Sequence, residues 1–366
     1  MAQSGIERID KLFAGAPGAV EIVEGDADKD AVRAVQDLLN GHEEGLPDVR
    51  ELTPDVKDPK YGKFDRRTLA HLKRFRLKHG LQGKNDPAKV DTPTLKRLVN
   101  EPARYPRASR PYVTLALDVA FTGMMRVLSG VALGEGAGKF TAINKGRRDL
   151  QGLSYGIIQW AQKQERLDDI VTAFKARQPQ RFRLTFGPDG DGMVEHVKKK
   201  RGGLTEGGET PEADKKFDLV ERWTQRFIDA GRDRELQKVQ IEVALANFRE
   251  LAADVRRFAP LIRTERGFAF MIDLANQHGS AGAESIFKAV FKEGNSEKTA
   301  LEEMSKESVT RSVNNHKLRL KKLVESGKMT EEQSKRNEKE FERGVTVRRK
   351  FFRTTPFFSD SDFNEN

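Results

Sequence analysis

Two carboxylic acids, Glu135 and Asp149, stand fourteen residues apart in a glycine-rich part of the chain. Glu135 lies just past an apolar stretch that is predicted to be helical, so its carboxyl group is expected to be partly desolvated at the negative end of a helix. Both effects raise the pKa of a carboxyl group, and a general acid needs a raised pKa near neutral pH. Asp149 is expected to stay ionised in its loop. Two carboxyl groups with different pKa values are the working parts of glycoside hydrolysis.

The elements that must position these acids differ in character. Apolar residues at helical spacing predict a buried helix that runs to about Gly134; they are Phe121, Met124, Met125, Leu128, Val131 and Ala132. Six glycines and a β-like piece, Phe140–Ile143, follow between residues 134 and 160. We expect a hairpin there that forms one wall of a sugar cleft. Further helices are predicted over 162–176, 217–229, 235–258 and 268–278.

The second acid opens a more specific motif. Asp149, Gly152, Ser154, Gly156 and Ile157 form the pattern Asp-x-x-Gly-x-Ser-x-Gly-Ile. It resembles the Asp-x-x-Gly-x-Thr-x-Gly-Ile pattern of the chitosanase branch of the lysozyme-like superfamily. The resemblance implies that Glu135 is the general acid and that Asp149 activates water. It also implies that the hydroxyl of Ser154 helps to place that water.

The resemblance extends over about residues 112–290. Gln240 and the segment Phe268–Gly279 resemble the later helices of that branch. Glu135–Lys139 together with Gly152–Gln159 also resembles goose-type lysozymes and lytic transglycosylases. Lytic transglycosylases generally lack a catalytic Asp, so the presence of Asp149 favours hydrolysis.

Several residues near the acids are candidates for binding substrate. Phe140, Tyr155 and Trp160 either stack on sugar faces or belong to the core, with equal weight. Arg147 binds an anionic peptide stem or lies in a solvated turn. His278 is a candidate ligand, although a structural cap or a satisfied core histidine is the favoured interpretation. Asn144 and Gln159 complete the candidate set. No metal and no cofactor is expected, because the fragment Gly187–Gly192 is too short for a calcium loop.

The N-terminal part carries a second resemblance. Residues 28–101 are similar to the three-helix peptidoglycan-binding domain of many cell-wall hydrolases. The resemblance rests on Val32–Leu39, Tyr61–Leu69, Leu72–Phe75, His79–Leu81, Val90–Thr94 and Leu98. A generic helical domain without a ligand remains an alternative, and the basic residues between Arg66 and Lys78 favour nucleic acid by charge alone.

These patterns predict a mainly α (α+β) fold with five segments. A small three-helix N-terminal module precedes a lysozyme-like helical domain that has a small β-hairpin wing. The expected segments are an N-terminal segment 1–27, a peptidoglycan-binding-like domain 28–101, a proline-containing linker 102–111, a catalytic domain 112–295 and a charged helical C-terminal extension 296–366. In the extension, Thr330–Gln333 has the sequence of a helix capping box.

The amino-acid composition restricts the classes of substrate that we expect. The 366 residues include 66 Lys and Arg against 56 Asp and Glu, a formal charge of +10. A basic protein is repelled by polycationic chitosan and attracted by peptidoglycan, which carries carboxylates. The absence of cysteine excludes disulfides, thiol catalysis and Cys-ligated zinc. The sequence therefore predicts an inverting, endo-acting muramidase that cleaves β-1,4 bonds of peptidoglycan glycan strands. A chitosanase, a lytic transglycosylase and a non-catalytic wall-binding protein are the alternatives.

Delivery is predicted from what the sequence lacks. Met1–Leu12 has no apolar core of a signal peptide, and no stretch of about 18 apolar residues predicts a membrane span. We therefore expect either a phage endolysin released through a holin pore or a bacterial effector injected by a contact-dependent machine. The expected partners are peptidoglycan and a secretion-machine or immunity protein, with no nucleic acid and no membrane insertion. We expect a monomer that is synthesised in the cytoplasm and acts in the periplasm or in the extracellular cell wall.

Overall fold

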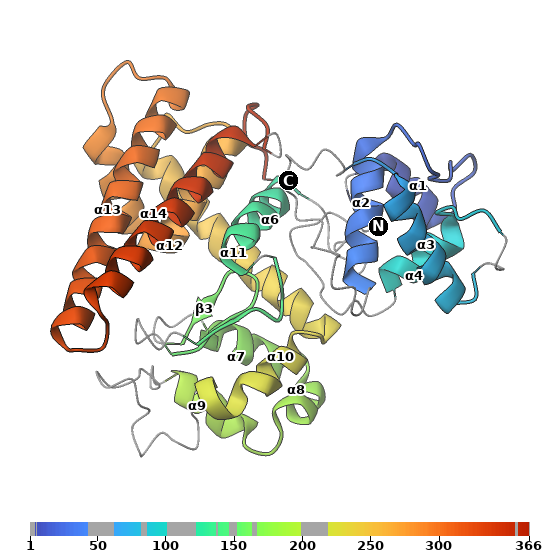
Figure 1. Cartoon of the computed structure of the whole chain (residues 1–366), viewed down its shortest axis with the longest axis horizontal. Helices are drawn as coiled ribbons and strands as arrows, with labels where there is room; N and C mark the ends of the chain where they lie inside the picture. Colours follow the sequence, from blue (N-terminus) through green and yellow to red (C-terminus); the bar gives the residue numbers. More distant parts are fainter. Residues whose placement is uncertain are drawn as a thin grey trace. The chain divides into compact units, whose positions relative to one another are not determined.

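The computed structural model describes most of the chain. The described residues are 4, 6–42, 62–81, 86–100, 122–136, 138–145, 152–162, 167–198, 219–355 and 358–365. They form thirteen α-helices, one π-helical turn and a three-stranded antiparallel sheet, which confirms the predicted mainly α fold with a small β wing (Figure 1). Among the described residues, no helix is both long enough and apolar enough to cross a lipid bilayer.

The chain divides into two compact units. The first unit combines Met1–Phe121 with Glu135–Ala244, and the second combines Thr122–Gly134 with Leu245–Asn366. The three breaks between the units follow residues 121, 134 and 244, and all fall inside the segment 112–295 that the sequence analysis assigns to one catalytic domain. The predicted C-terminal extension 296–366 lies within the second unit rather than outside it.

The N-terminal part of the first unit is a small helical bundle. Its helices are α1 (Glu7–Ala14), α2 (Lys29–His42), α3 (Arg66–Lys78) and α4 (Thr92–Asn100). The bundle thus adds α1 to the three helices predicted from 28–101. Ile22 pairs with Val90 in an isolated antiparallel bridge, and the hydroxyl of Thr92 donates to the carbonyl of Leu12 (2.9 Å). These long-range contacts make the segment 1–27 part of the bundle.

The ends of α3 and α4 follow their sequence signals. The carboxylate of Asp65 accepts from the backbone N–H groups of Arg67 and Thr68 at the start of α3. Asp91 accepts from the N–H of Thr94 at the start of α4. Gly80 follows α3 with a positive φ of 65°, which is the left-handed residue expected after a helix.

The remaining part of the first unit holds the β wing and a group of short helices. Strands β1 (Ile143–Asn144), β2 (Ser154–Tyr155) and β3 (Trp160–Ala161) pair in sequence order, and Asn144 lies opposite Ser154. The helices are α7 (Leu167–Arg177), α8 (Pro179–Phe186), α9 (Gly190–Lys198), the π-helical turn Leu219–Trp223 and α10 (Thr224–Ala230). Their core contains Phe174, Phe182, Phe186 and Phe227, whose rings pack in successive contacts.

The second unit is built on long helices. They are α12 (Glu265–Val290), α13 (Glu297–Glu325) and α14 (Glu331–Thr354), together with the second-unit residues of α6 (Gly123–Gly136) and α11 (Arg234–Phe258). Helices α13 and α14 run antiparallel and both pack on α12 (Figure 1). The predicted capping box is confirmed, because Thr330 and Gln333 exchange both of its hydrogen bonds.

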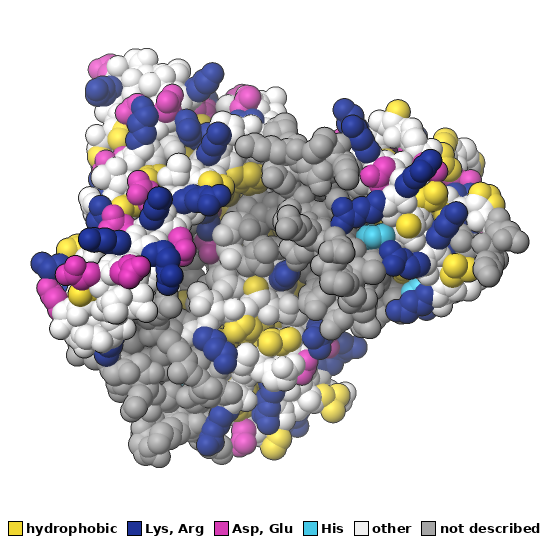
Figure 2. All heavy atoms as spheres, in the orientation of Figure 1, with side chains coloured by type: hydrophobic (Ala, Val, Ile, Leu, Met, Phe, Trp, Pro, Cys, Tyr) yellow, Lys and Arg dark blue, Asp and Glu magenta, His cyan; other side chains and the backbone are white. Residues whose placement is uncertain are grey.

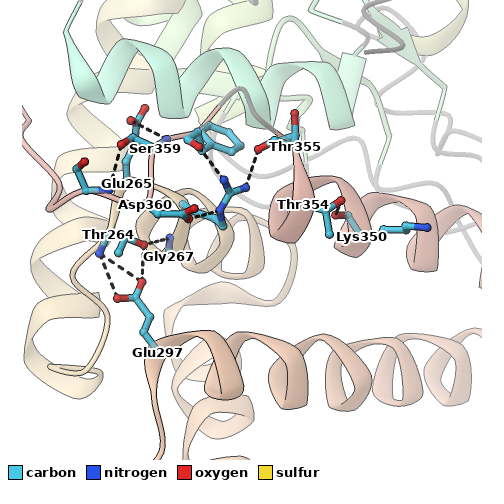
Figure 3. A network of polar contacts seen from close by, with 12 residues as sticks. Thr264, Glu265, Gly267, Glu297, Lys350, Thr354, Thr355, Ser359 and Asp360 are labelled. Atoms are coloured by element: carbon cyan, nitrogen blue, oxygen red, sulfur yellow. Dashed lines mark hydrogen bonds and ion pairs between the residues drawn. The ribbon is translucent and has the colours of Figure 1, made fainter. Parts of the chain in front are cut away.

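A C-terminal strap, made of Thr355 and residues 358–364, returns along the first turn of α12. Thr264 bridges to Asp362, and the Glu265 N–H donates to the carbonyl of Ser361 (3.1 Å). Figure 3 shows the Glu265 side chain beside Ser359, whose N–H donates to the carboxylate (3.2 Å). The same figure shows the Glu297 carboxylate against Thr264, where it accepts from the backbone N–H and the hydroxyl.

The strap also inserts an aromatic side chain into the unit. Phe358 is 2% exposed, and a Cβ added to Gly130 of α6 would lie only 2.2 Å from its ring. The Arg266 guanidinium donates to the carbonyls of Thr355 (2.7 Å) and Phe358 (2.8 Å) and so fixes the backbone on both sides of the ring's entry point. The C-terminal segment therefore belongs to the core of the second unit.

Replacing Phe358→Ala is expected to lower the free energy of unfolding by about 3–5 kcal/mol, because it removes a buried ring and leaves a cavity. Urea unfolding of the full chain measures the change. Leu318→Ala is the matched control, since Leu318 is 61% exposed in the same unit and its truncation should cost no more than about 0.5 kcal/mol. Equal losses for the two variants would contradict the role assigned to the strap.

Candidate active site

Glu135 lies in the last turn of α6, where its side chain is half-buried. The predicted apolar stripe forms the buried face of this helix, including Met124, Leu128 and Val131. The helix ends at Gly136, two residues later than predicted, so Glu135 belongs to the helix rather than following it. The helix therefore carries the carboxyl group at its C-terminal end, as the sequence indicates.

Ser154 opens β2 between two glycines that hold unusual backbone conformations. Its side chain is largely enclosed, with 9% of the residue exposed. Gly152 and Gly156 have φ values of 74° and 80°, which only glycine adopts readily. A Cβ on Gly156 would also lie 2.4 Å from the Oε1 atom of Gln240. The glycine spacing of the motif is thus explained by a tight hairpin, with the exposed Asn144 paired opposite Ser154.

Gln240 ties this hairpin to α11. The side chain is fully buried, its Oε1 atom accepts from the N–H of Ile157 (3.2 Å), and its Nε2 atom donates to the carbonyl of Phe140 (3.1 Å) and to the hydroxyl of Tyr155 (3.3 Å). The resemblance singled out Gln240 without assigning it a role. Amides at buried positions of an otherwise apolar helical face, here Gln237 and Gln240, are the sequence signal for such a tie.

The three aromatic candidates are core residues. Phe140 and Tyr155 are 0% exposed and Trp160 is 1% exposed. Tyr155 meets the edge of Phe227 with ring centroids 5.0 Å apart, and burial raises the pKa of its hydroxyl. The alternative in which these rings stack on sugar is therefore wrong for this structure, because none offers a face to a ligand.

Gln159 has a strained backbone. It is the one non-glycine residue with a positive φ (55°) in the part of the chain that the structure describes. Its Nε2 atom donates to the carbonyls of Gly156 (2.9 Å) and Ala142 (3.3 Å) and thereby closes the turn between β2 and β3. Side chains in such conformations persist only where the surroundings fix them. Gln159 therefore shapes the hairpin through its own amide.

His278 and Asp273 lie on α12 in the second unit. Burial, and then the nearby Arg349 cation, lowers the pKa of His278 to about 4, and its ring lies 3.5 Å from the hydroxyl of Ser312. These contacts favour the structural interpretation of His278. Asp273 is fully buried between the guanidinium groups of Arg348 and Arg349.

The remaining predicted residues are not part of the described structure. Asp149 and Arg147 lie outside the described residues. The structure thus brings Ser154, Asn144 and Gln159 together on the hairpin and locates Glu135 at the end of α6. No group of three His, Asp or Glu side chains that could hold a metal ion occurs among the described residues.

Comparison with known proteins identifies no relative by sequence. No protein family and no curated protein matches this chain. Among solved structures, a mutant chitosanase from Bacillus subtilis MY002, complexed with 6 GlcN, is similar with a TM-score of 0.40 and 14% sequence identity. The similarity covers 63% of this chain and 87% of that chain. It is too weak to establish a shared family.

Replacing Gln240→Leu is expected to lower the free energy of unfolding by about 2–4 kcal/mol, because the buried groups of Ile157 and Phe140 lose their partner. Gln237→Leu is the matched control. Gln237 is also buried on α11, but its side chain donates a single hydrogen bond, to the carbonyl of Gly231 (2.9 Å). Its loss should be roughly half as large. A larger effect of Gln237→Leu in urea unfolding would show that Gln240 is not the main tie.

The pKa of His278 predicts a pH dependence of stability. The folded pKa, about 4, is below the reference value of 6.5, so the unfolded chain binds a proton first as the pH falls. The stabilisation is fully present above pH 6.5 and is lost between that pH and about 4. His278→Gln should reduce this loss when melting temperatures are compared at pH 7 and pH 4.5. Identical pH profiles for the two proteins would contradict the assignment.

Proposed function

We propose that the chain is a lysozyme-like glycoside hydrolase that cleaves β-1,4 bonds of bacterial peptidoglycan. The observation that carries the proposal is the hairpin around Ser154, which begins shortly after the helix end that bears Glu135. Gly152 and Gly156 both adopt left-handed conformations there. This backbone geometry explains why the motif has glycine at these two positions. A half-buried carboxyl group and an enclosed hydroxyl are components that acid–base hydrolysis needs.

In the proposed mechanism, Glu135 protonates the glycosidic oxygen and is left as a carboxylate. Asp149 takes a proton from a water molecule on the opposite face of the sugar, and the hydroxyl of Ser154 helps to orient that water. The water oxygen bonds to the anomeric carbon as the bond from that carbon to the protonated glycosidic oxygen breaks, which inverts the anomeric centre. Inversion needs carboxyl groups about 6.5–9.5 Å apart, whereas about 5–5.5 Å would give retention.

The choice of peptidoglycan over chitosan is supported by charge. The chain has a formal charge of +10, which attracts an anionic wall at long range and repels a polycation. The N-terminal bundle α1–α4 is proposed to hold the enzyme on the wall. Release as a phage endolysin or injection as an antibacterial effector is the proposed route to the substrate, the latter with an immunity protein as partner.

The variant Glu135→Gln tests whether Glu135 is the general acid. It should lower the release of reducing ends from purified sacculi by at least about 100-fold, since a general acid contributes about 10²–10⁴ in rate, while binding to sacculi is retained. Glu250→Gln is the control, because Glu250 is an exposed carboxylate on α11 and its loss should leave the rate unchanged. Full activity of the Glu135 variant would refute the assignment.

The reaction products distinguish hydrolysis of peptidoglycan from the alternative reactions. Mass spectrometry of soluble muropeptides should find reducing ends at N-acetylmuramic acid, the product of hydrolysis. Products with 1,6-anhydro ends would instead indicate a lytic transglycosylase. Faster cleavage of chitosan than of sacculi at equal enzyme concentration would favour a chitosanase.

A further inference from the structure

Helix α6 carries glycine at three positions where the C-terminal part of the chain contacts it. Gly123, Gly130 and Gly134 are separated by seven and four residues, which is close to two turns and one turn of a helix with 3.6 residues per turn. The three glycines therefore lie in one line along α6. Glycine in the interior of a helix is destabilising relative to alanine, so Gly130 in particular needs a reason in the packing.

Two of these glycines contact the C-terminal strap. A Cβ atom on Gly130 would collide with the ring of Phe358, and a Cβ atom on Gly123 would collide with the carbonyl oxygen of Asn364. The ring of Phe358 is also held by α14, because it stacks on Phe352 with the ring centroids 5.7 Å apart. The strap therefore meets α6 at its first residue and again two turns later.

The third glycine contacts α14. The Arg348 guanidinium donates to the carbonyl of Gly134 (2.9 Å), and a Cβ atom on Gly134 would lie 3.0 Å from the central carbon of that guanidinium. Asp273 of α12 holds the same group, whose Nε atom lies 3.0 and 3.1 Å from the two carboxylate oxygens. The last carbonyls of a helix have no partner within the helix, so Arg348 supplies one of them from the body of the second unit.

An ion pair also connects the first turn of α6 with the strap. The Nε atom of Arg126 lies 2.8 Å from a carboxylate oxygen of Glu265. The same carboxylate accepts from the backbone N–H of Ser359 in the strap (3.2 Å). The start of α6 is therefore coupled to the strap through Glu265 as well as directly.

The outer surfaces of α13 and α14 carry charges of both signs. Figure 2 shows Lys and Arg side chains interleaved with Asp and Glu side chains over the two helices. Lys317 of α13, for example, pairs with Glu338 of α14 (2.9 Å). The contacts that connect α14 to α6 and to the strap are instead made by Arg348 and Phe352, from the same end of α14 as the strap.

The position of α6 determines the position of Glu135. This residue follows Gly134 directly in the last turn of the helix. A helix moves as a rod, so a shift or rotation of α6 displaces the Glu135 carboxyl group with it. A misplacement of about 1 Å can lower the rate of an enzyme about 100-fold. The contacts that fix α6 therefore bear on acid catalysis by Glu135.

We propose that the C-terminal strap positions the general acid, with Phe358 packed against Gly130 to fix the height and the rotation of α6. The inference rests on the proposed function, because it takes Glu135 as the acid. Phe358 is a positioning residue, since it acts on Glu135 through the helix.

The variant Gly130→Ala tests this contact in the full chain, because the added methyl group must displace either the ring of Phe358 or α6 itself. Gly344→Ala is the matched control. Gly344 is an exposed helical glycine of α14, and a Cβ atom there would meet no described atom within 4 Å. The release of reducing ends from soluble peptidoglycan strands gives kcat and KM, at a temperature where circular dichroism shows each variant fully folded. Hydrogen exchange of α6 relative to α13 is the second measurement.

Gly130→Ala should lower kcat at least about tenfold and change KM less than about twofold, since the position of the acid affects bond cleavage rather than binding. The amides of α6 should exchange at least about fivefold faster relative to those of α13. Adding Phe358→Leu to Gly130→Ala should recover kcat at least about threefold, because the smaller side chain makes room for the methyl group. Gly344→Ala should keep kcat within about twofold of the unmodified protein.

Equal kcat values for Gly130→Ala and Gly344→Ala would overturn the proposal, as would unchanged exchange of α6 or a loss of kcat that Phe358→Leu does not relieve. If Gly130→Ala fails to fold, Phe358→Leu alone should lower kcat at least about threefold with KM unchanged, and a kcat equal to that of the unmodified protein would overturn the proposal.

The two levels of inference fail in different ways. An unmodified protein that releases no reducing ends would refute the proposed hydrolase and, with it, the positioning of its acid. An active protein whose kcat is insensitive to Gly130→Ala would refute only the positioning by the strap.

Discussion

The second unit is organised around one buried carboxylate. Asp273 is fully buried on α12 and accepts from Arg348 and Arg349 of α14. Arg349 also donates to the hydroxyl of Ser308 (3.0 Å), and Arg348 donates to the carbonyl of Gly134 (2.9 Å), one residue before Glu135. A buried charge without its partner is strongly destabilising. Helix α12 can therefore bury Asp273 only when α14 is docked, so the charged C-terminal helices are part of this unit's structure.

The first unit uses an uncharged counterpart of that arrangement. The Gln240 amide satisfies backbone groups on both sides of the hairpin, at Phe140 and Ile157. Gly156 leaves space for the amide, because any side chain there would collide with it. The hydroxyl of Ser154 thus owes its position to a side chain on α11 rather than to the three short strands. Strand pairs of two residues each could not hold the Ser154 hydroxyl rigidly without such a tie.

Sequence analysis succeeded where structure is determined locally and failed where it depends on distant partners. The capping box at Thr330 and the apolar stripe of α6 follow from residues within a few positions of each other. Helices α8 and α9 were not predicted, because Pro179 and the glycines near 190 are typical of loops. The burial of Asp273 was also not predicted, and for the hairpin aromatics the core was one of two equally weighted interpretations. Their partners lie far along the chain, Arg348 at 75 positions from Asp273, and no local pattern connects them.

The same distinction applies to charge. Arg76 and Lys73 stand three positions apart on α3, yet Arg76 is buried with Asp91 while Lys73 faces solvent. The buried Arg76 and the exposed Lys73 each contribute one unit to the net charge. Charges act together only within about one Debye length, roughly 8 Å at physiological salt, so the cations of α13 and α14 are screened by the carboxylates interleaved with them. The total of +10 therefore does not by itself identify the cations that face solvent, and only the fold separates them from cations such as Arg76 that are buried in ion pairs.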